Sequence, residues 1–81
     1  MTKEQITDWA MTEREIEFRH NGIWYSITYF RKDGKRWISF CEFYKDTFDV
    51  ETTDDLWESI YHGSRVSDLL SSVSDDEITV F

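Results

Sequence analysis

Hydrophobic and polar positions change their period along the chain, and these changes predict the order of the elements. In the first stretch, apolar residues recur at the spacing of one helix face: Ile6, Trp9 and Ala10. Thr2 and Gln5 have the spacing of a capping box, in which each side chain bonds the other's backbone N–H. The pattern predicts a helix that begins after Thr2 and ends within residues 11–13.

Two turn signals divide the next stretch into strands. Asn21-Gly22 and Asp33-Gly34 are dipeptides typical of two-residue hairpin loops, whose central residues need positive φ. They separate apolar–polar alternations at residues 14–20, 23–32 and 35–45. We therefore expect a three-stranded antiparallel meander. A two-residue loop also fixes which residues face each other, so the register can be derived.

The derived register places one set of large apolar residues on a single face. These residues are Ile16, Phe18, Tyr25, Ile27, Tyr29, Ile38 and Phe40. Both hairpins select the same face independently, and such agreement supports the register. This face is expected to be the core side of the sheet.

The opposite face of the meander holds the remaining rings. Its cross-strand pairs are Trp24 with Phe43 and Phe30 with Trp37. Small side chains lie between the two pairs: Ser26, Thr28, Ser39 and Cys41. Two interpretations follow. Either a helix or the C-terminal segment of the same chain covers this face, or the four rings form an interface with a partner protein or a second copy.

The C-terminal part predicts two short helices and a final strand. Thr52 and Asp55 have capping-box spacing, and the pairs Leu56/Ile60 and Trp57/Tyr61 recur at i, i+4. Gly63 is the predicted end of this helix.

A second helix is expected to begin at Ser64. Its inward-facing residues would be Val66, Leu69, Leu70 and Val73, and "EITVF" then indicates a short strand. The segment before residue 52 is predicted to be a polar connection anchored by Phe48 and Val50. The chain is thus expected to be one α+β domain over residues 1–81: an N-terminal helix, the meander, two short helices and a terminal strand.

Composition supports a packed domain with an acidic surface. Four Trp, four Tyr and six Phe can fill a core despite the length of 81 residues. The net charge of −8 argues against direct nucleic-acid binding, which needs basic surface. The only dense basic group flanks the second turn: Arg31, Lys32, Lys35 and Arg36. A charged, solvated hairpin tip is the preferred interpretation of this group.

The acidic residues gather in the C-terminal part. The candidate acidic surface consists of Asp54, Asp55, Glu58, Asp68, Asp75 and Asp76. One interpretation is a solvated face that keeps the protein soluble. The other is a mimic of nucleic acid that occupies the basic groove of another protein.

The sequence contains few residues of the kinds and spacings that a catalytic or metal site needs. One Cys and two His lack the spacing of a zinc site, so no metal or cofactor is expected. Cys41 falls on the face opposite His20, which argues against a Cys–His pair and for a non-enzymatic protein. No signal peptide or long apolar run is present, and a cytoplasmic protein without membrane contact is expected.

The stretch "ISFCEFYKDTFDVETTDDLWESIYHGSRVSDLL" resembles small acidic α+β proteins of Gram-positive bacteria and their mobile elements. The likeness implies a bacterial or phage-encoded accessory protein and no catalytic residues. In topology alone, the helix–meander–helices order is similar to that of some small acidic anti-CRISPR proteins. The sequence therefore predicts a protein-interaction module, with an inhibitor that mimics nucleic acid as the alternative.

Overall fold

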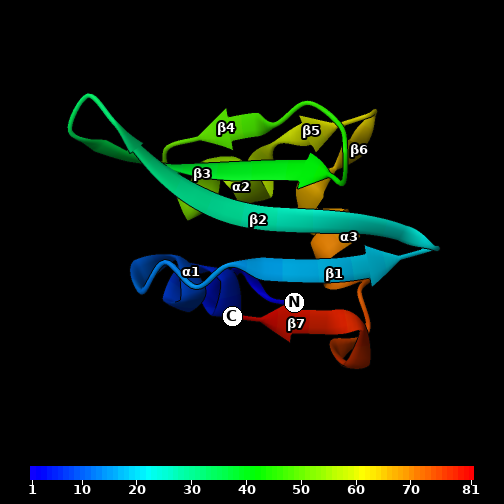
Figure 1. Ribbon diagram of the computed structural model, residues 1–81. Coiled ribbons are helices and arrows are strands. Elements are labelled where there is room, and N and C mark those ends of the chain that lie inside the picture. Colours follow the sequence, from blue (N-terminus) through cyan, green and yellow to red (C-terminus); the bar gives the residue numbers. More distant parts are fainter.

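A five-stranded antiparallel sheet, in the order β4-β3-β2-β1-β7, carries the three α-helices on one of its faces (Figure 1). The computed structural model describes residues 1–81. Its elements are α1 (Lys3–Met11), β1 (Ile16–His20), β2 (Ile23–Lys32), β3 (Lys35–Glu42), β4 (Phe48–Val50), α2 (Thr53–Glu58), β5 (Ile60–Tyr61), β6 (Ser64–Arg65), α3 (Val66–Ser71), the 3₁₀ helix η1 (Asp75–Glu77) and β7 (Ile78–Val80). The α+β class predicted from the sequence is confirmed.

The meander has the register derived from its two turns. Ile16 faces Ile27 across the first hairpin, and Ile27 faces Phe40 across the second. All four turn residues have positive φ, between 51° and 78°, as the two-residue loop requires. The strands are shorter than expected at their outer ends, because β1 begins at Ile16 and β3 ends at Glu42.

Helix α1 has partners for its backbone groups at both ends. Thr2 and Gln5 form the predicted capping box, with bonds of 3.0 and 3.1 Å between each side chain and the other's backbone N–H. At the C-terminal end, Arg36 Nη1 donates to the carbonyl oxygen of Ala10 at 2.7 Å. A cation near the last turn of a helix bonds carbonyl oxygens that have no partner within the helix. It also interacts favourably with the negative end of the helix dipole. Arg36 thus joins the long hairpin to α1.

The core lies between the predicted sheet face and the helices. Its fully buried sheet residues are Ile16, Phe18, Ile27, Ile38 and Phe40, and the helices contribute Ile6, Ala10, Leu56, Val66 and Leu70. The ring of Tyr25 stacks on Phe18 and Phe40, with centroids 5.1 and 5.9 Å apart. Stacked rings at such distances stabilise the fold by more than their buried apolar area alone would do.

Tyr29 is the one residue of the core face whose hydroxyl is buried without a hydrogen-bond partner in the protein. Burial raises the pKa of this hydroxyl from its ordinary value of 10.0 to about 12. The unfolded chain then loses its proton first. The protonated Tyr29 hydroxyl therefore makes its full contribution to the free energy of unfolding below about pH 10, and this contribution is lost as the pH rises towards 12.

We expect Tyr29→Phe to leave the free energy of unfolding at pH 7 unchanged or to raise it by up to about 1 kcal/mol, because a buried unpaired hydroxyl is costly. The variant should also lose less stability than the native chain between about pH 10 and pH 12. Urea denaturation at both ends of this range measures the difference, with Tyr44→Phe at a fully exposed position as the control. A clear loss of stability at pH 7 would show that the hydroxyl has a partner after all.

The segment Phe48–Val50 was predicted to be a polar connection, and this prediction is wrong. It forms β4, an edge strand on β3, with Phe48 opposite Phe40 and Val50 opposite Ile38. The two residues do anchor the segment, since both are half-buried and lie on the core face of the sheet. Three residues are too few for alternation to be distinguished from a loop.

The helix predicted to reach Gly63 ends instead at Glu58. Ile60–Tyr61 and Ser64–Arg65 form a small hairpin, so Ser64 belongs to β6 and α3 begins at Val66. His62 and Gly63 have φ of 50° and 82°, the same turn geometry as Asn-Gly. The i, i+4 spacing of Ile60 with Leu56 was therefore coincidental.

The terminal strand β7 is confirmed, and the structure decides where it lies. It pairs antiparallel with β1, so that Ile78 faces Phe18 and Val80 faces Ile16. The backbone N–H of Phe81 donates to Glu15 at 2.9 Å and continues the ladder by one bond. The last residues of the chain thereby complete the sheet on the side opposite β4.

Candidate binding face

The helices leave one face of the sheet uncovered, and we call it the open face (Figure 1). The rings of Trp24 and Phe30 have exposed fractions of 42% and 38% there. Trp37 and Phe43 are half-buried on the same face. Of the two interpretations that the sequence left open, coverage by a helix or by the C-terminal segment does not occur within this chain. The four candidate interface residues thus lie together on one accessible face.

Trp24 and Phe43 begin a row of contacts across the strands near the Asn21-Gly22 turn. Their ring centroids are 6.0 Å apart, and the guanidinium of Arg19 lies 5.7 Å from the centroid of Trp24. Arg19 also donates two hydrogen bonds of 3.0 Å to Glu77, which lower the pKa of that carboxyl. Trp24, Phe43, Arg19 and Glu77 form the first row.

The second row stands nearer the Asp33-Gly34 turn. Phe30 and Trp37 face each other across β2 and β3, with centroids 6.4 Å apart and planes at 10°. Aromatic pairs across two strands stabilise the strand pairing. The open face therefore has an aromatic pair at each end.

Small side chains form the floor between the two rows. Ser26 faces Cys41, with Oγ and Sγ 3.5 Å apart, and Thr28 faces Ser39. Ser39 is buried with an exposed fraction of 6%, which places the floor well below the ring tips. We call the space over these four residues, between the rows, the trough.

Carboxylates stand at both lateral ends of the trough. Glu17 faces Ser26 from β1, and Asp49 faces Ser39 from β4. Glu15 precedes Glu17 by two residues and lies on the same face, since side chains alternate along an extended chain. Two bases of the open face are engaged elsewhere, since Arg19 binds Glu77 and Lys35 lies 3.7 Å from Glu51. The trough thus has an aromatic pair along each of its long sides and carboxylates at its ends.

Two of the four cations at the tip of the long hairpin pair with carboxylates of neighbouring segments, and a third bonds a carbonyl oxygen. Arg31 lies 3.2 Å from Glu13, Lys35 pairs with Glu51, and Arg36 binds the carbonyl of Ala10. Of the four bases that flank the turn, Lys32 alone makes no such contact. The tip is solvated as expected, since Arg31, Lys32 and Lys35 are exposed. Three of its four cations also contact neighbouring elements.

The candidate acidic surface lies mostly on α2 and α3, away from the open face, and extends to η1 beside β1. All six carboxylates are exposed, on α2, α3 and η1: Asp54, Asp55, Glu58, Asp68, Asp75 and Asp76. Asp54 pairs with Lys3 at 2.6 Å, and this hydrogen bond raises the pKa of the lysine. The other five make no ion pair. The molecule therefore has two chemically different sides.

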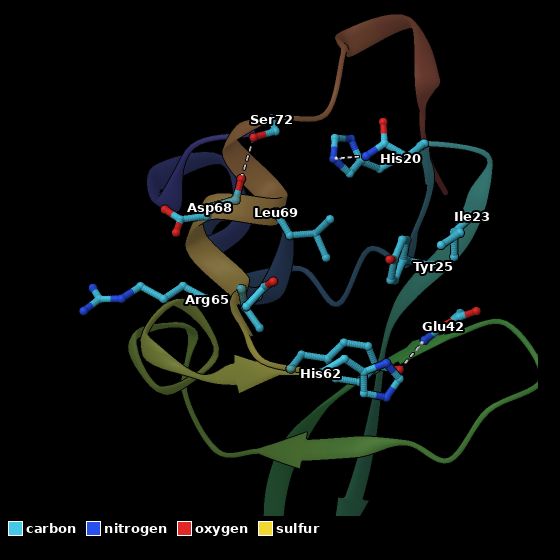
Figure 2. Close-up of a pocket in the computed structure, with 13 residues that line it drawn as sticks. His20, Ile23, Tyr25, Glu42, His62, Arg65, Asp68, Leu69 and Ser72 are labelled. Carbon is cyan, nitrogen blue, oxygen red and sulfur yellow. Dashed lines mark hydrogen bonds between the residues drawn. The ribbon is translucent and has the colours of Figure 1, made fainter.

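A hollow of about 450 Å³ lies beside α3, between the first hairpin turn and the β5–β6 hairpin (Figure 2). It brings together His20 and His62, which are distant in the sequence. The ring of His62 stacks on Tyr61 at 4.1 Å, and the Tyr61 hydroxyl accepts a hydrogen bond from the Glu42 N–H at 3.1 Å. Figure 2 shows Arg65 pointing away from this space.

The hollow contains no nucleophile paired with a base. Cys41 is not among its lining residues and lies on the open face, as the register predicted. No group of three or more His, Cys, Asp or Glu side chains is placed to hold a metal ion. None of the helices has the length and apolar character needed to cross a bilayer.

Sequence reasoning missed one exposed aromatic residue of this region. Tyr44 follows β3 with a fully exposed ring and a φ of 66°, and it borders a second hollow of about 520 Å³ together with Trp24 and Phe43. The derived register had placed Tyr44 inside a strand. No turn signal precedes it, because the chain leaves the strand at a non-glycine residue with positive φ.

Comparisons of the chain with protein-family models, with curated proteins and with solved structures found no match.

Proposed function

We propose that the chain is a non-enzymatic protein-interaction module whose open face binds another protein with a basic surface. One observation carries the proposal: the three α-helices pack on the same side of the sheet, and two aromatic pairs, each with one exposed and one half-buried ring, lie on the other. Exposed Trp and Phe clusters are costly to keep in water and are enriched among the residues that dominate binding energy.

The charges favour a different protein over a second copy. Two open faces related by a two-fold axis would bring their floors together, since a two-fold interface uses the same patch twice. Glu15, Glu17 and Asp49 of both copies would then meet around the two floors, and neither floor contains a cation. Like charges placed opposite one another disfavour association. A partner that supplies Lys or Arg at this position would instead be attracted.

Site-specific photo-crosslinking in the native host tests the proposal. Phe30→p-benzoylphenylalanine keeps a ring on the open face, and Asp55→p-benzoylphenylalanine puts the same probe on the helical side. We expect a discrete adduct with one basic protein from position 30 only. An adduct with a second copy of the chain, or no adduct from position 30, would contradict the proposal.

The acidic surface supports a second candidate function, an inhibitor that mimics nucleic acid. Its specific observation is that five of the six carboxylates of this surface are exposed and free of ion pairs. Such a surface would attract the basic groove of a nucleic-acid-binding protein. The same experiment separates the two functions, because an adduct from position 55 alone would favour the inhibitor.

A further inference from the structure

We propose that the occupant of the trough is a basic α-helix that lies across the strands, with its cations about three helical turns apart. The inference rests on the function proposed above and adds the shape and charge spacing of the partner. It follows from the separation of the aromatic rows, the depth of the floor and the positions of the carboxylates.

The distance between the rows fits the width of a helix. Trp24 and Phe30 are six residues apart on β2, and a rise of about 3.4 Å per residue separates them by roughly 20 Å. The ring side chains occupy part of this distance, and the gap left between the two rows is close to the diameter of a helix with its side chains, about 10–12 Å. An extended segment, which is narrower, would leave part of the floor uncovered.

The floor allows close approach of such a helix. Ser26, Thr28, Ser39 and Cys41 are all small, and Ser39 is already buried below the surface. The helix therefore needs small or slender apolar residues where it meets the floor, and its sides can pack against the rings of Trp24 and Phe30. This packing would bury the rings that the monomer leaves exposed.

The positions of the carboxylates at the ends of the trough predict the spacing of the Lys or Arg residues on the partner helix. Asp49 is on β4 and Glu17 on β1, with β3 and β2 between them, so three inter-strand spacings separate them. Their rows also differ by two residues along β2, because Glu17 faces Ser26 while Asp49 lies in the row of Ser39 and Thr28. With about 4.8 Å per spacing across the strands and about 3.4 Å per residue along them, the two positions are roughly 16 Å apart. A helix rises about 1.5 Å per residue, so ten to eleven residues span the distance. Cations about eleven residues apart also return to the same helix face after three turns.

Two synthetic peptides test this geometry. Both are Ala-rich helices of about 18 residues, a length at which an isolated helix can form. The matched peptide carries lysines at its fourth and fifteenth positions, on the same face as a short Ala and Leu stripe. The displaced peptide has the same composition, with both lysines moved to the opposite face.

Cys41 serves as the reporter, because it is the chain's only cysteine and lies on the floor. We expect the matched peptide to slow alkylation of Cys41 and to bind at least tenfold more tightly than the displaced peptide. Equal binding of the two peptides would overturn the proposed spacing.

Two sets of charge variants separate the trough from general electrostatic attraction. Glu15→Gln, Glu17→Gln and Asp49→Asn together should weaken binding of the matched peptide at least tenfold. Asp55→Asn, Glu58→Gln and Asp68→Asn remove the same charge from α2 and α3 on the helical side, and they should change the affinity for the matched peptide less than threefold. Equal losses from the two sets would overturn the inference.

Failure of the inference can be distinguished from failure of the proposed function. If the matched peptide does not bind but position 30 still crosslinks to a basic protein, the open face is an interface and the crossing helix is wrong. If neither binding nor crosslinking occurs, both proposals fail.

Discussion

Phe40→Ala is expected to lower the free energy of unfolding by about 3–5 kcal/mol, the usual cost of truncating a buried Phe. Phe40 is fully buried on β3 and contacts the rings of Tyr25 and Tyr61, whose centroids lie 5.9 and 5.0 Å away. Its removal leaves a cavity that these rings cannot close without losing their own contacts. Since small domains are stable by only about 5–15 kcal/mol, much of the fold's stability depends on this ring.

Phe30→Ala is the matched control, because it removes the same side chain from the neighbouring strand on the opposite face. The Phe30 ring is 38% exposed and leaves no enclosed cavity, so we expect a loss of about 1 kcal/mol, the scale of a cross-strand pair. Denaturant unfolding of the two variants measures the contrast. Similar losses would mean that the open face is packed as tightly as the core.

The double variant Trp24→Ala with Trp37→Ala is expected to weaken partner binding by 100-fold or more while the protein stays folded. Truncation of a hot-spot ring costs about 2 kcal/mol or more, and about 1.4 kcal/mol corresponds to a tenfold change in affinity. Titration calorimetry with the crosslinked partner, once purified, gives the affinity. Circular dichroism shows whether the double variant keeps the secondary structure of the native chain.

Two outcomes of this experiment would count against the open face as an interface. Unchanged affinity would show that the rings do not contact the partner. Unfolding of the double variant would show that they belong to the core, and Trp24→Ala alone, at the more exposed position, then remains as the binding test. The matched control for binding is Trp57→Ala, on the helical side of the molecule.

The meander and its two faces were predictable because the signals that determine them are local. Asn21-Gly22 and Asp33-Gly34 each need positive φ at two successive residues, and a loop of that length fixes every pair along the strands. Once the register was fixed, alternation assigned Phe40 to one face and Phe30 to the other. The candidate interface followed from the same reasoning.

The predictions that failed concern segments whose local signals are short or ambiguous. His62-Gly63 makes the same turn as Asn-Gly, but histidine is a less common residue there and the preceding i, i+4 pairs indicated a helix. Strand β4 has three residues and is defined by its ladder to β3. Tyr44 adopts a positive φ although no glycine in the sequence indicates a turn there.

The sequence by itself determined the three-stranded meander, its register and the identity of the rings on each face, because two-residue turns and alternation act between neighbours in the chain. The tertiary structure alone decided that all helices share one side, that β7 completes the sheet beside β1, and that Glu17 and Asp49 flank the same floor. The helices could have been divided between the faces. They gather where Ile16, Phe18, Ile27, Ile38 and Phe40 offer the larger continuous apolar area, and burial of that area is the dominant favourable term in folding.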